Sequence, residues 1–144
     1  MKMPLVRPVE KFVGSDGKLH RIQKWFGRRQ WKLEEPFEYT LPGDGEFIVI
    51  PAGFTFDFAS VPRLFWPVLH PVGLLLIGSI IHDYAYRYHY LKTTMGIKMR
   101  LDRKQADRLL LEITKAETGI RIGSCLAWAS VRIGGRGSWS KKSQ

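Results

Sequence analysis

Two short stretches of this chain place polar side chains among apolar ones, as a binding or catalytic site would require. Residues 53–63 read GFTFDFASVPR and put the carboxylate of Asp57 among phenylalanines, while residues 82–86 read HDYAY and put His82 beside Asp83. A charged group in apolar surroundings costs free energy unless it is paired, hydrogen-bonded or bound to a metal. We therefore expect these groups to converge, either on a ligand or on one another.

The His-Asp pair belongs to a stretch that is expected to form a helix from about Val72 to Tyr90. At about 100° per residue, the polar side chains of this helix fall within one arc, and its other faces are apolar. A helix that is apolar nearly all round is a buried helix, so the polar arc should face partners inside the fold or line a cleft. The arc consists of Ser79, His82, Asp83, Tyr86 and Tyr90, joined by Leu75.

A second helix is expected from about Asp102 to Glu117 or Thr118. Asp102 suits an N-cap because its carboxylate can accept the free backbone N–H groups of the first turn, and Gly119 suits the helix end. The apolar face of this helix consists of Ala106, Leu109, Leu110, Ile113 and Ala116.

Asp107 lies beside that apolar face, and two positions are open to it. A solvated carboxylate at the boundary of the helix is the default expectation. Alternatively, the basic connection at residues 92–100 could let the two helices pack antiparallel, which would bring Asp107 towards the level of His82 and Asp83. Three carboxylates, counting Asp57, and one imidazole would suit Mg²⁺, Mn²⁺ or Zn²⁺.

Two interpretations of these polar groups stay open. In the first they form a site that holds a divalent metal or positions water, and neighbouring groups orient the substrate. The catalytic candidates are then Asp57, His82, Asp83 and Asp107, the metal ligands are Asp57, His82 and Asp83, and the substrate is oriented by Tyr86 or Ser60. In the second interpretation the same groups, together with Ser60 and Arg63, are structural hydrogen-bonding residues that fasten the loop at 53–63 to the helix.

The first half of the chain carries strand signals. Residues 18–26 alternate in part, residues 37–41 alternate more cleanly, and residues 46–50 form a β-branched run. The sequence PGDG at 42–45 separates the last two and indicates a hairpin. Prolines at 51, 62, 67 and 71 argue against a central strand or a continuous helix, so residues 51–71 should form an ordered loop.

A third helix is expected at residues 124–133, ending at Gly134 and Gly135, with Cys125 as a small core residue. The pattern predicts an α+β fold with an N-terminal antiparallel β-sheet packed with about three C-terminal α-helices. We expect residues 1–139 to form a single domain and the basic residues 140–144 to be disordered.

The charge of the chain bears on its partners. Lys and Arg number 23 against 13 Asp and Glu, so the formal net charge is +10. Such a surface attracts polyanions, whether nucleic acid, acidic envelope polymers or acidic proteins, although a solvated basic face is the plainer alternative. The most apolar segment, residues 72–81, is shorter than the roughly twenty residues that span a bilayer, and the start of the chain has no signal-peptide core. We expect a soluble protein without a membrane span.

Four motifs, taken in order, resemble a family of small proteins that is widespread in tailed bacteriophages and prophages, domain-of-unknown-function family 1353. The motifs are GFTFDFASVPR at 53–63, HDYAY at 82–86, DRKQAD at 102–107 and VRIGGRGSW at 131–139. The residues that match are Asp57, Ser60, Pro62, Arg63, His82, Asp83, Tyr86, Arg103 and Asp107. The chain departs from the family pattern at Phe56, which separates Thr55 from Asp57, and at Ala85, where leucine is usual.

This resemblance implies a phage or prophage protein of the host cytoplasm or the virion, but it supplies no reaction. It adds Arg63 and Arg103 to Ser60 and Tyr86 as substrate-binding candidates. One hypothesis is a metal-assisted hydrolase acting on an anionic substrate, a phosphodiester or a cell-envelope polymer. The alternative is a non-enzymatic virion or tail accessory protein, or a host-interaction factor, in which the Asp/His network is structural and the partners are other phage proteins. A weaker similarity to HD-type metal phosphohydrolases would add His70 as a ligand.

Overall fold

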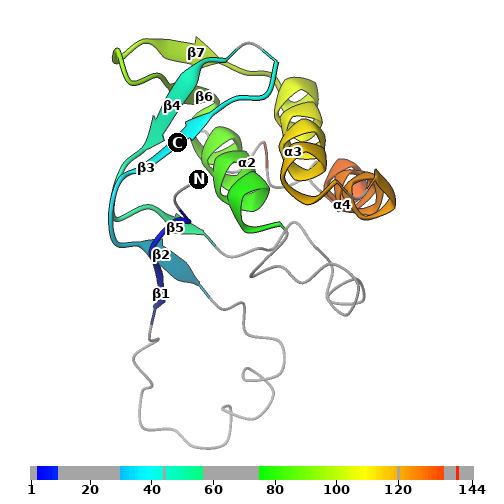
Figure 1. Cartoon of the computed structure of the whole chain (residues 1–144), viewed down its shortest axis with the longest axis horizontal. Helices are drawn as coiled ribbons and strands as arrows, with labels where there is room; N and C mark the ends of the chain where they lie inside the picture. Colours follow the sequence, from blue (N-terminus) through cyan, green and yellow to red (C-terminus); the bar gives the residue numbers. More distant parts are fainter. Residues whose placement is uncertain are drawn as a thin grey trace, which may run out of the picture.

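Antiparallel strands, a central helix and two outer helices make up the part of the chain that the structure describes (Figure 1). The computed structural model describes residues 3–9, 30–43, 45–56, 75–119, 121–134 and 139. Figure 1 shows α2 (Leu76–Tyr88) between the strands on one side and α3 (Arg103–Thr118) and α4 (Arg121–Gly134) on the other. The predicted α+β fold, with antiparallel strands and C-terminal helices, is confirmed.

The strands of the first half pair in two small antiparallel sheets. One contains β1 (Val6–Pro8), β2 (Trp31–Leu33) and β5 (Thr55–Phe56), with β2 in the middle. The other is the predicted hairpin of β3 (Phe37–Thr40) and β4 (Phe47–Ile50). Along β3, Phe37 and Tyr39 are buried while Glu38 and Thr40 are exposed, because successive side chains of a strand point to opposite faces.

The connection between the first two helices holds a third pair of strands that sequence patterns did not indicate. The strands β6 (Tyr90–Lys92) and β7 (Lys98–Arg100) form an antiparallel hairpin. This hairpin joins the edge of β4, since Ile48 pairs with Thr93 and the backbone N–H of Thr94 donates to the carbonyl of Phe47 at 3.0 Å. A basic run therefore forms an extension of the β3–β4 sheet, where a plain connection was expected.

Helix α2 is the buried centre of the fold, as its sequence predicted. All its residues from Leu76 to Tyr86 are buried. The helix ends at Tyr88, two residues before the predicted end at Tyr90, because His89 adopts a left-handed conformation with φ 59°. The backbone N–H of His89 donates to the carbonyl of Ala85, which closes the helix, and Tyr90 starts a strand and leaves the polar arc.

Helix α3 has the predicted boundaries. Asp102 and Gln105 form a reciprocal capping box with both hydrogen bonds at 2.7 Å, and Gly119 ends the helix with φ 66°. The predicted apolar face is wrong at one end: Ala116 is exposed, whereas Thr114 is buried and donates its hydroxyl proton to the carbonyl of Leu110. That bond satisfies the only polar group of the threonine side chain, so Thr114 can be buried.

Helix α4 starts at Arg121, three residues before the predicted start, and ends at Gly134 as expected. Cys125 was predicted to be a core residue, but it is exposed on this helix. The buried side of α4 instead carries Ser124, Ala127 and Val131, which recur at helical spacing.

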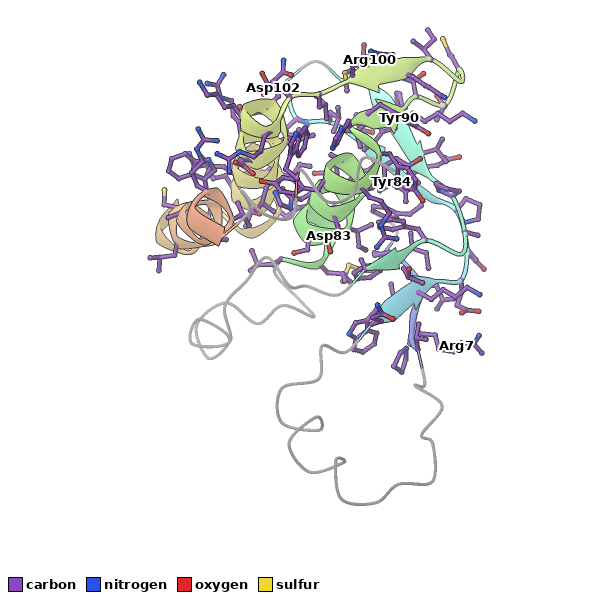
Figure 2. The ribbon with its side chains drawn as sticks, turned by 180° about the vertical axis from the view of Figure 1, so that it is seen from behind. Arg7, Asp83, Tyr84, Tyr90, Arg100 and Asp102 are labelled. Carbon is purple, nitrogen blue, oxygen red and sulfur yellow. The ribbon has the colours of Figure 1, made fainter. Side chains whose placement is uncertain are left out.

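An aromatic cluster fills the space between α2 and the strands. The ring of Tyr84 packs edge-on against Phe54 at 5.2 Å and against Tyr90 at 6.2 Å, both measured between ring centroids. Figure 2 shows Tyr84 on the side of α2 that faces the strand bearing Tyr90. The strand side of α2 is thus largely aromatic, with Arg87 lying over the Phe54 ring, and His82 and Asp83 lie elsewhere on the helix.

Some predictions fall on residues that the structure does not describe. These include the strand at residues 18–26, the loop from residue 57 to residue 71 with the candidates Asp57, Ser60, Arg63 and His70, and the tail at 140–144. In the described part of the chain, no helix combines the length and the apolar character that crossing a bilayer requires.

Gly78 allows α2 and α3 to approach closely. A Cβ atom at this position would lie 2.9 Å from Thr114 Oγ1 and 3.0 Å from Leu110 Cδ1. Gly78 of α2 lies beside Leu110 and Thr114 of α3, whereas His82, one turn later on α2, meets Asp107, which comes earlier on α3. The two helices therefore run antiparallel. This is the packing that the second prediction for Asp107 required.

Gly78→Ala should therefore lower the free energy of unfolding by about 1 kcal/mol, because overpacking of about 1–3 kcal/mol exceeds the helix-propensity gain of about 1 kcal/mol. Urea unfolding measures this change. Adding Thr114→Ala removes the nearest atom and leaves only Leu110 in close contact, so Gly78→Ala should cost less in a Thr114→Ala background than in the native protein. Equal costs in the two backgrounds would contradict the close approach.

Candidate functional site

The carboxylate of Asp107 is the centre of a buried polar network. The residue is 0 % exposed, and three side chains contact its carboxylate. The hydroxyl of Tyr86 donates to Oδ1 at 2.5 Å, His82 Nε2 lies 3.2 Å from the same oxygen, and Arg132 Nη1 donates to Oδ2 at 3.2 Å. The default expectation of a solvated carboxylate is wrong, since antiparallel packing of α2 and α3 brings Asp107 into the interior.

Helical spacing positions each member of this network. His82 and Tyr86 are four residues apart on α2, so their side chains share one face, and their ring centroids are 4.1 Å apart. Arg103 and Asp107 have the same spacing on α3. Arg132 reaches Asp107 from α4, and its own carbonyl accepts a hydrogen bond from Arg103 Nη1 at 3.5 Å. The network thus ties three helices together.

Trp139 extends the network on its aromatic side. Its ring packs edge-on against Tyr86 with centroids 4.9 Å apart and stacks on His89 with centroids 4.2 Å apart. These contacts cover the ring of Tyr86 and the residue that ends α2. The last residue of the motif at 131–139, Trp139, therefore meets the HDYAY motif in space.

The protonation of His82 is decided by two opposing effects. Burial by itself lowers its pKa, but the hydrogen bond to Asp107 and the negative charges of Asp83 and Asp107 outweigh burial, so the pKa of His82 lies above its usual 6.5. With both ring nitrogens protonated, Nε2–H donates to Asp107, and Nδ1–H faces Asp83 Oδ1 at 3.8 Å.

The pKa of Asp107 is lowered and that of Tyr86 is raised, and both shifts preserve the hydrogen bond between them. Burial raises the pKa of Asp107, but the contacts with His82, Tyr86 and Arg132 outweigh it and hold the pKa below its usual 3.8. For Tyr86, burial and then the hydrogen bond to Asp107 raise the pKa above its usual 10. Asp107 thus remains an ionised acceptor at neutral pH, and Tyr86 remains a protonated donor.

The candidate residues separate into three groups. The structure brings together His82, Tyr86 and Asp107 directly, and Arg103 through Arg132. Asp83 is buried beside the ring of His82 but on the side away from Asp107. Asp57, Ser60 and Arg63 lie outside the described residues, so their place in the site stays a prediction.

The network also contains Arg132 and Trp139, which the sequence did not identify as candidate site residues. Both belong to the motif VRIGGRGSW, which carried the family resemblance without assigning either residue a role. Their contacts join residues 25 or more positions apart in the chain, such as Arg132 and Asp107. No periodicity within one element indicates a contact of that range.

The metal set predicted from the sequence is not assembled within the described residues. Among them, no group of three or more His, Cys, Asp or Glu side chains is arranged to hold a metal ion. The oxygens of Asp107 already accept from three donors, and a protonated His82 has no lone pair to offer a metal. Asp57 is outside the described residues, so a set of Asp57, His82 and Asp83 remains a prediction.

Removing the charge of Asp107 should destabilise the protein strongly. Asp107→Asn keeps the shape of the side chain but leaves Arg132 and a protonated His82 beside a neutral amide. Breaking a buried ion pair costs about 3–5 kcal/mol, and we expect about 3 kcal/mol because Arg132 is partly exposed and His82 can lose its proton.

Urea unfolding gives this value, and Glu112→Gln on the exposed face of the same helix is the matched control, with a change within about 0.5 kcal/mol. A loss for Asp107→Asn no larger than that of the control would show that the network contributes nothing to stability.

The raised pKa of His82 predicts a pH dependence of stability. At pH values below 6.5 the residue is protonated in both the folded and the unfolded chain, so its stabilisation is complete. Above pH 6.5 the unfolded chain loses the proton first, and the free energy of unfolding falls until the pH passes the folded pKa.

The difference in unfolding free energy between the native protein and His82→Gln should therefore shrink as the pH rises above 6.5. The other histidines are common to both proteins and cancel in the difference. Urea unfolding at a series of pH values measures it, and parallel curves over the whole range would contradict a protonated His82.

Comparison with known proteins places the chain in a family. A family model described as a protein of unknown function, DUF1353, matches residues 31–131. No curated protein and no solved structure matches the chain. The matched range contains His82, Asp83, Tyr86, Arg103 and Asp107 and stops one residue before Arg132. Because the match covers well over half of its length, this chain belongs to the family of proteins of unknown function DUF1353.

Proposed function

We propose that this protein is a non-enzymatic bacteriophage or prophage component, either a virion or tail accessory protein or a host-interaction factor. In this proposal the network around Asp107 is structural. The observation that carries it is the environment of the Asp107 carboxylate, which is fully buried and accepts from three donors. A general base or metal ligand needs a lone pair that substrate, water or metal can reach. The oxygens of Asp107 are instead buried and occupied by donors from the protein itself.

The charges of the network support the same role. The carboxylate of Asp107 lies 3.2 Å from the guanidinium of Arg132 and 3.2 Å from the imidazole of His82, whose pKa is raised. A buried carboxylate that accepts from three side chains on two neighbouring helices stabilises one arrangement of those helices. The geometry is that of a polar clamp between α2, α3 and α4.

The partner part of the proposal rests on the surface and on the four motifs. A formal charge of +10 favours an anionic partner, which is an acidic phage or host protein, an envelope polymer or nucleic acid. Exposed cations occur on several elements, among them Lys98 on β7 and Lys104 and Arg108 on α3. The resemblance of the motifs to phage and prophage proteins favours a phage protein as the partner.

The test of the proposal compares stability with biological effect. Asp83→Asn and Asp107→Asn should lower the melting temperature, and phage production should fall only as far as the folded fraction falls. The protein should also be found in fixed stoichiometry in purified particles or in complex with a host protein. Two results together would contradict a structural network. One is an Asp83→Asn variant that folds normally but abolishes phage production, and the other is the absence of the protein both from purified particles and from any complex with a host protein.

A second candidate function is the metal-assisted hydrolase, and one observation favours it. His82 Nδ1 is buried, has no hydrogen-bond partner among the described residues and lies 3.8 Å from Asp83 Oδ1. A neutral His82 and Asp83 would present one nitrogen and one oxygen donor on the same side, and Asp57 of the family motif would be the third ligand. The substrate would be a phosphodiester or an envelope polymer.

Calorimetric titration with Mg²⁺, Mn²⁺ and Zn²⁺ distinguishes the two candidates. The hydrolase requires saturable binding that Asp83→Ala abolishes, that raises the melting temperature and that weakens at low pH because a metal must displace a proton from His82. The structural network predicts no saturable binding of any of the three ions.

A further inference from the structure

The turn between β6 and β7 exposes large apolar side chains. Met95 is 87 % exposed and Ile97 is 63 % exposed, and the neighbouring end of β4 adds Phe47 at 58 %. The backbone N–H of Thr94 donates to the carbonyl of Phe47 at 3.0 Å, so the three residues belong to one corner of the molecule. We call Phe47, Met95 and Ile97 the apolar tip. Single exposed apolar residues are ordinary, but three at one corner are a candidate for an interaction surface.

The apolar tip is held by hydrogen bonds and does not need a partner to take its shape. The backbone N–H of Gly96 donates to the carbonyl of Thr93, and that of Thr93 donates to the carbonyl of Ile97, both at 2.9 Å. Thr93 Oγ1 accepts from the N–H of Ile97 at 3.1 Å, and Gly96 provides the positive φ that the turn needs. Side chains on a preordered turn lose little entropy on binding, which favours their use as anchors.

Two cations flank the apolar tip, and the Nζ atom of one of them, Lys98, lies 4.8 Å from the centroid of the Tyr90 ring. Lys92 and Lys98 are directly opposite each other in the β6–β7 ladder, and both are exposed. Like charges at paired positions of neighbouring strands repel each other. An anionic partner would relieve this repulsion. A surface complementary to the tip would therefore have an apolar recess for its apolar side chains and carboxylates beside the recess for its two lysines.

The same molecule carries a recess of that description. A hollow of about 460 Å³ is lined by the apolar residues Met3, Leu5, Pro36 and Phe37 and by the carboxylates of Glu35 and Glu38. Its described lining contains two acidic side chains and no basic one, although the chain as a whole is strongly basic. Its volume falls within the range of about 300–1,000 Å³ that is usual for binding pockets. We call it the acidic hollow.

The apolar tip and the acidic hollow lie at opposite ends of the β3–β4 ladder. Phe37, which lines the hollow, pairs with Ile50 at one end, and Phe47 of the tip pairs with Thr40 at the other. Figure 1 likewise shows β7 and β1 at opposite ends of the layer of strands. One copy therefore cannot fill its own hollow with its own tip through this rigid ladder, whereas two copies can meet head to tail.

We propose that the protein associates with further copies of itself, the apolar tip of one copy entering the acidic hollow of the next. Met95 and Ile97 fill the recess, and Lys92 and Lys98 face Glu35 and Glu38. The contact joins two different surfaces, so each copy keeps one free surface of each kind, and repetition gives rings or filaments. A second copy is the occupant because apolar and charged parts of the two surfaces match within one chain.

Sedimentation velocity over a concentration series tests this proposal with the full chain. The native protein should associate reversibly, and the tip variant Met95→Ser/Ile97→Ser and the hollow variant Glu38→Lys should each weaken association by about tenfold or more. All substituted positions are exposed, so the variants should fold. Leu126→Ser, an exposed apolar position on α4, and Glu112→Lys on α3 are the matched controls and should associate like the native protein.

Mixing the two variants is the decisive step. The tip variant keeps an intact hollow and the hollow variant keeps an intact tip, so an equal mixture should form pairs of one copy each and nothing larger. Native protein that stays monomeric throughout overturns the proposal. Association that persists unchanged in both variants also overturns the proposal. Binding of monomers to anionic phospholipid vesicles that depends on Met95 would assign the tip to a membrane surface and also overturn self-association.

Discussion

The burial of one carboxylate constrains how the helices of this protein pack. Asp107 is buried, and an unpaired carboxylate in such a place costs several kcal/mol or takes up a proton. Its charge is kept because α2 supplies His82 and Tyr86 and α4 supplies Arg132. Each donor must arrive within hydrogen-bonding distance, so the carboxylate sets the approach of both neighbouring helices to α3.

The same constraint explains the two-sided character of α2. The helix is buried nearly all round, and its strand side packs Tyr84 against Phe54 and Tyr90. On the side of α3, the missing side chain of Gly78 allows close contact, and the His82 and Tyr86 side chains meet Asp107 four to eight residues further along the helix. Apolar packing supplies most of the stability, and the polar clamp selects one register between the helices.

Local chemistry was predictable from the sequence, whereas of the contacts across the fold only the approach of Asp107 to His82 was anticipated, as one of two alternatives. The ends of α3 follow from Asp102, Gln105 and Gly119, and the burial of α2 follows from its composition. The end of α2 escaped prediction because His89 adopts a left-handed backbone that residues other than glycine rarely adopt. Cys125 was misplaced because an apolar neighbourhood does not say which side of a helix is covered. The pairing of Asp107 with Arg132 depends on how α3 and α4 pack, which their separate patterns do not contain.

A clamp and a metal site make different demands on one side chain. In the clamp, the Nε2–H of His82 donates to Asp107, and the raised pKa of His82 favours a second proton on Nδ1, whereas a metal site needs one nitrogen free of its proton. The most direct measurement is the ¹⁵N chemical shift of both His82 ring nitrogens at pH 7, taken with and without Zn²⁺. The structural account predicts two protonated nitrogens whose shifts do not change with the metal. A single neutral tautomer whose free nitrogen shifts on adding Zn²⁺ would contradict it.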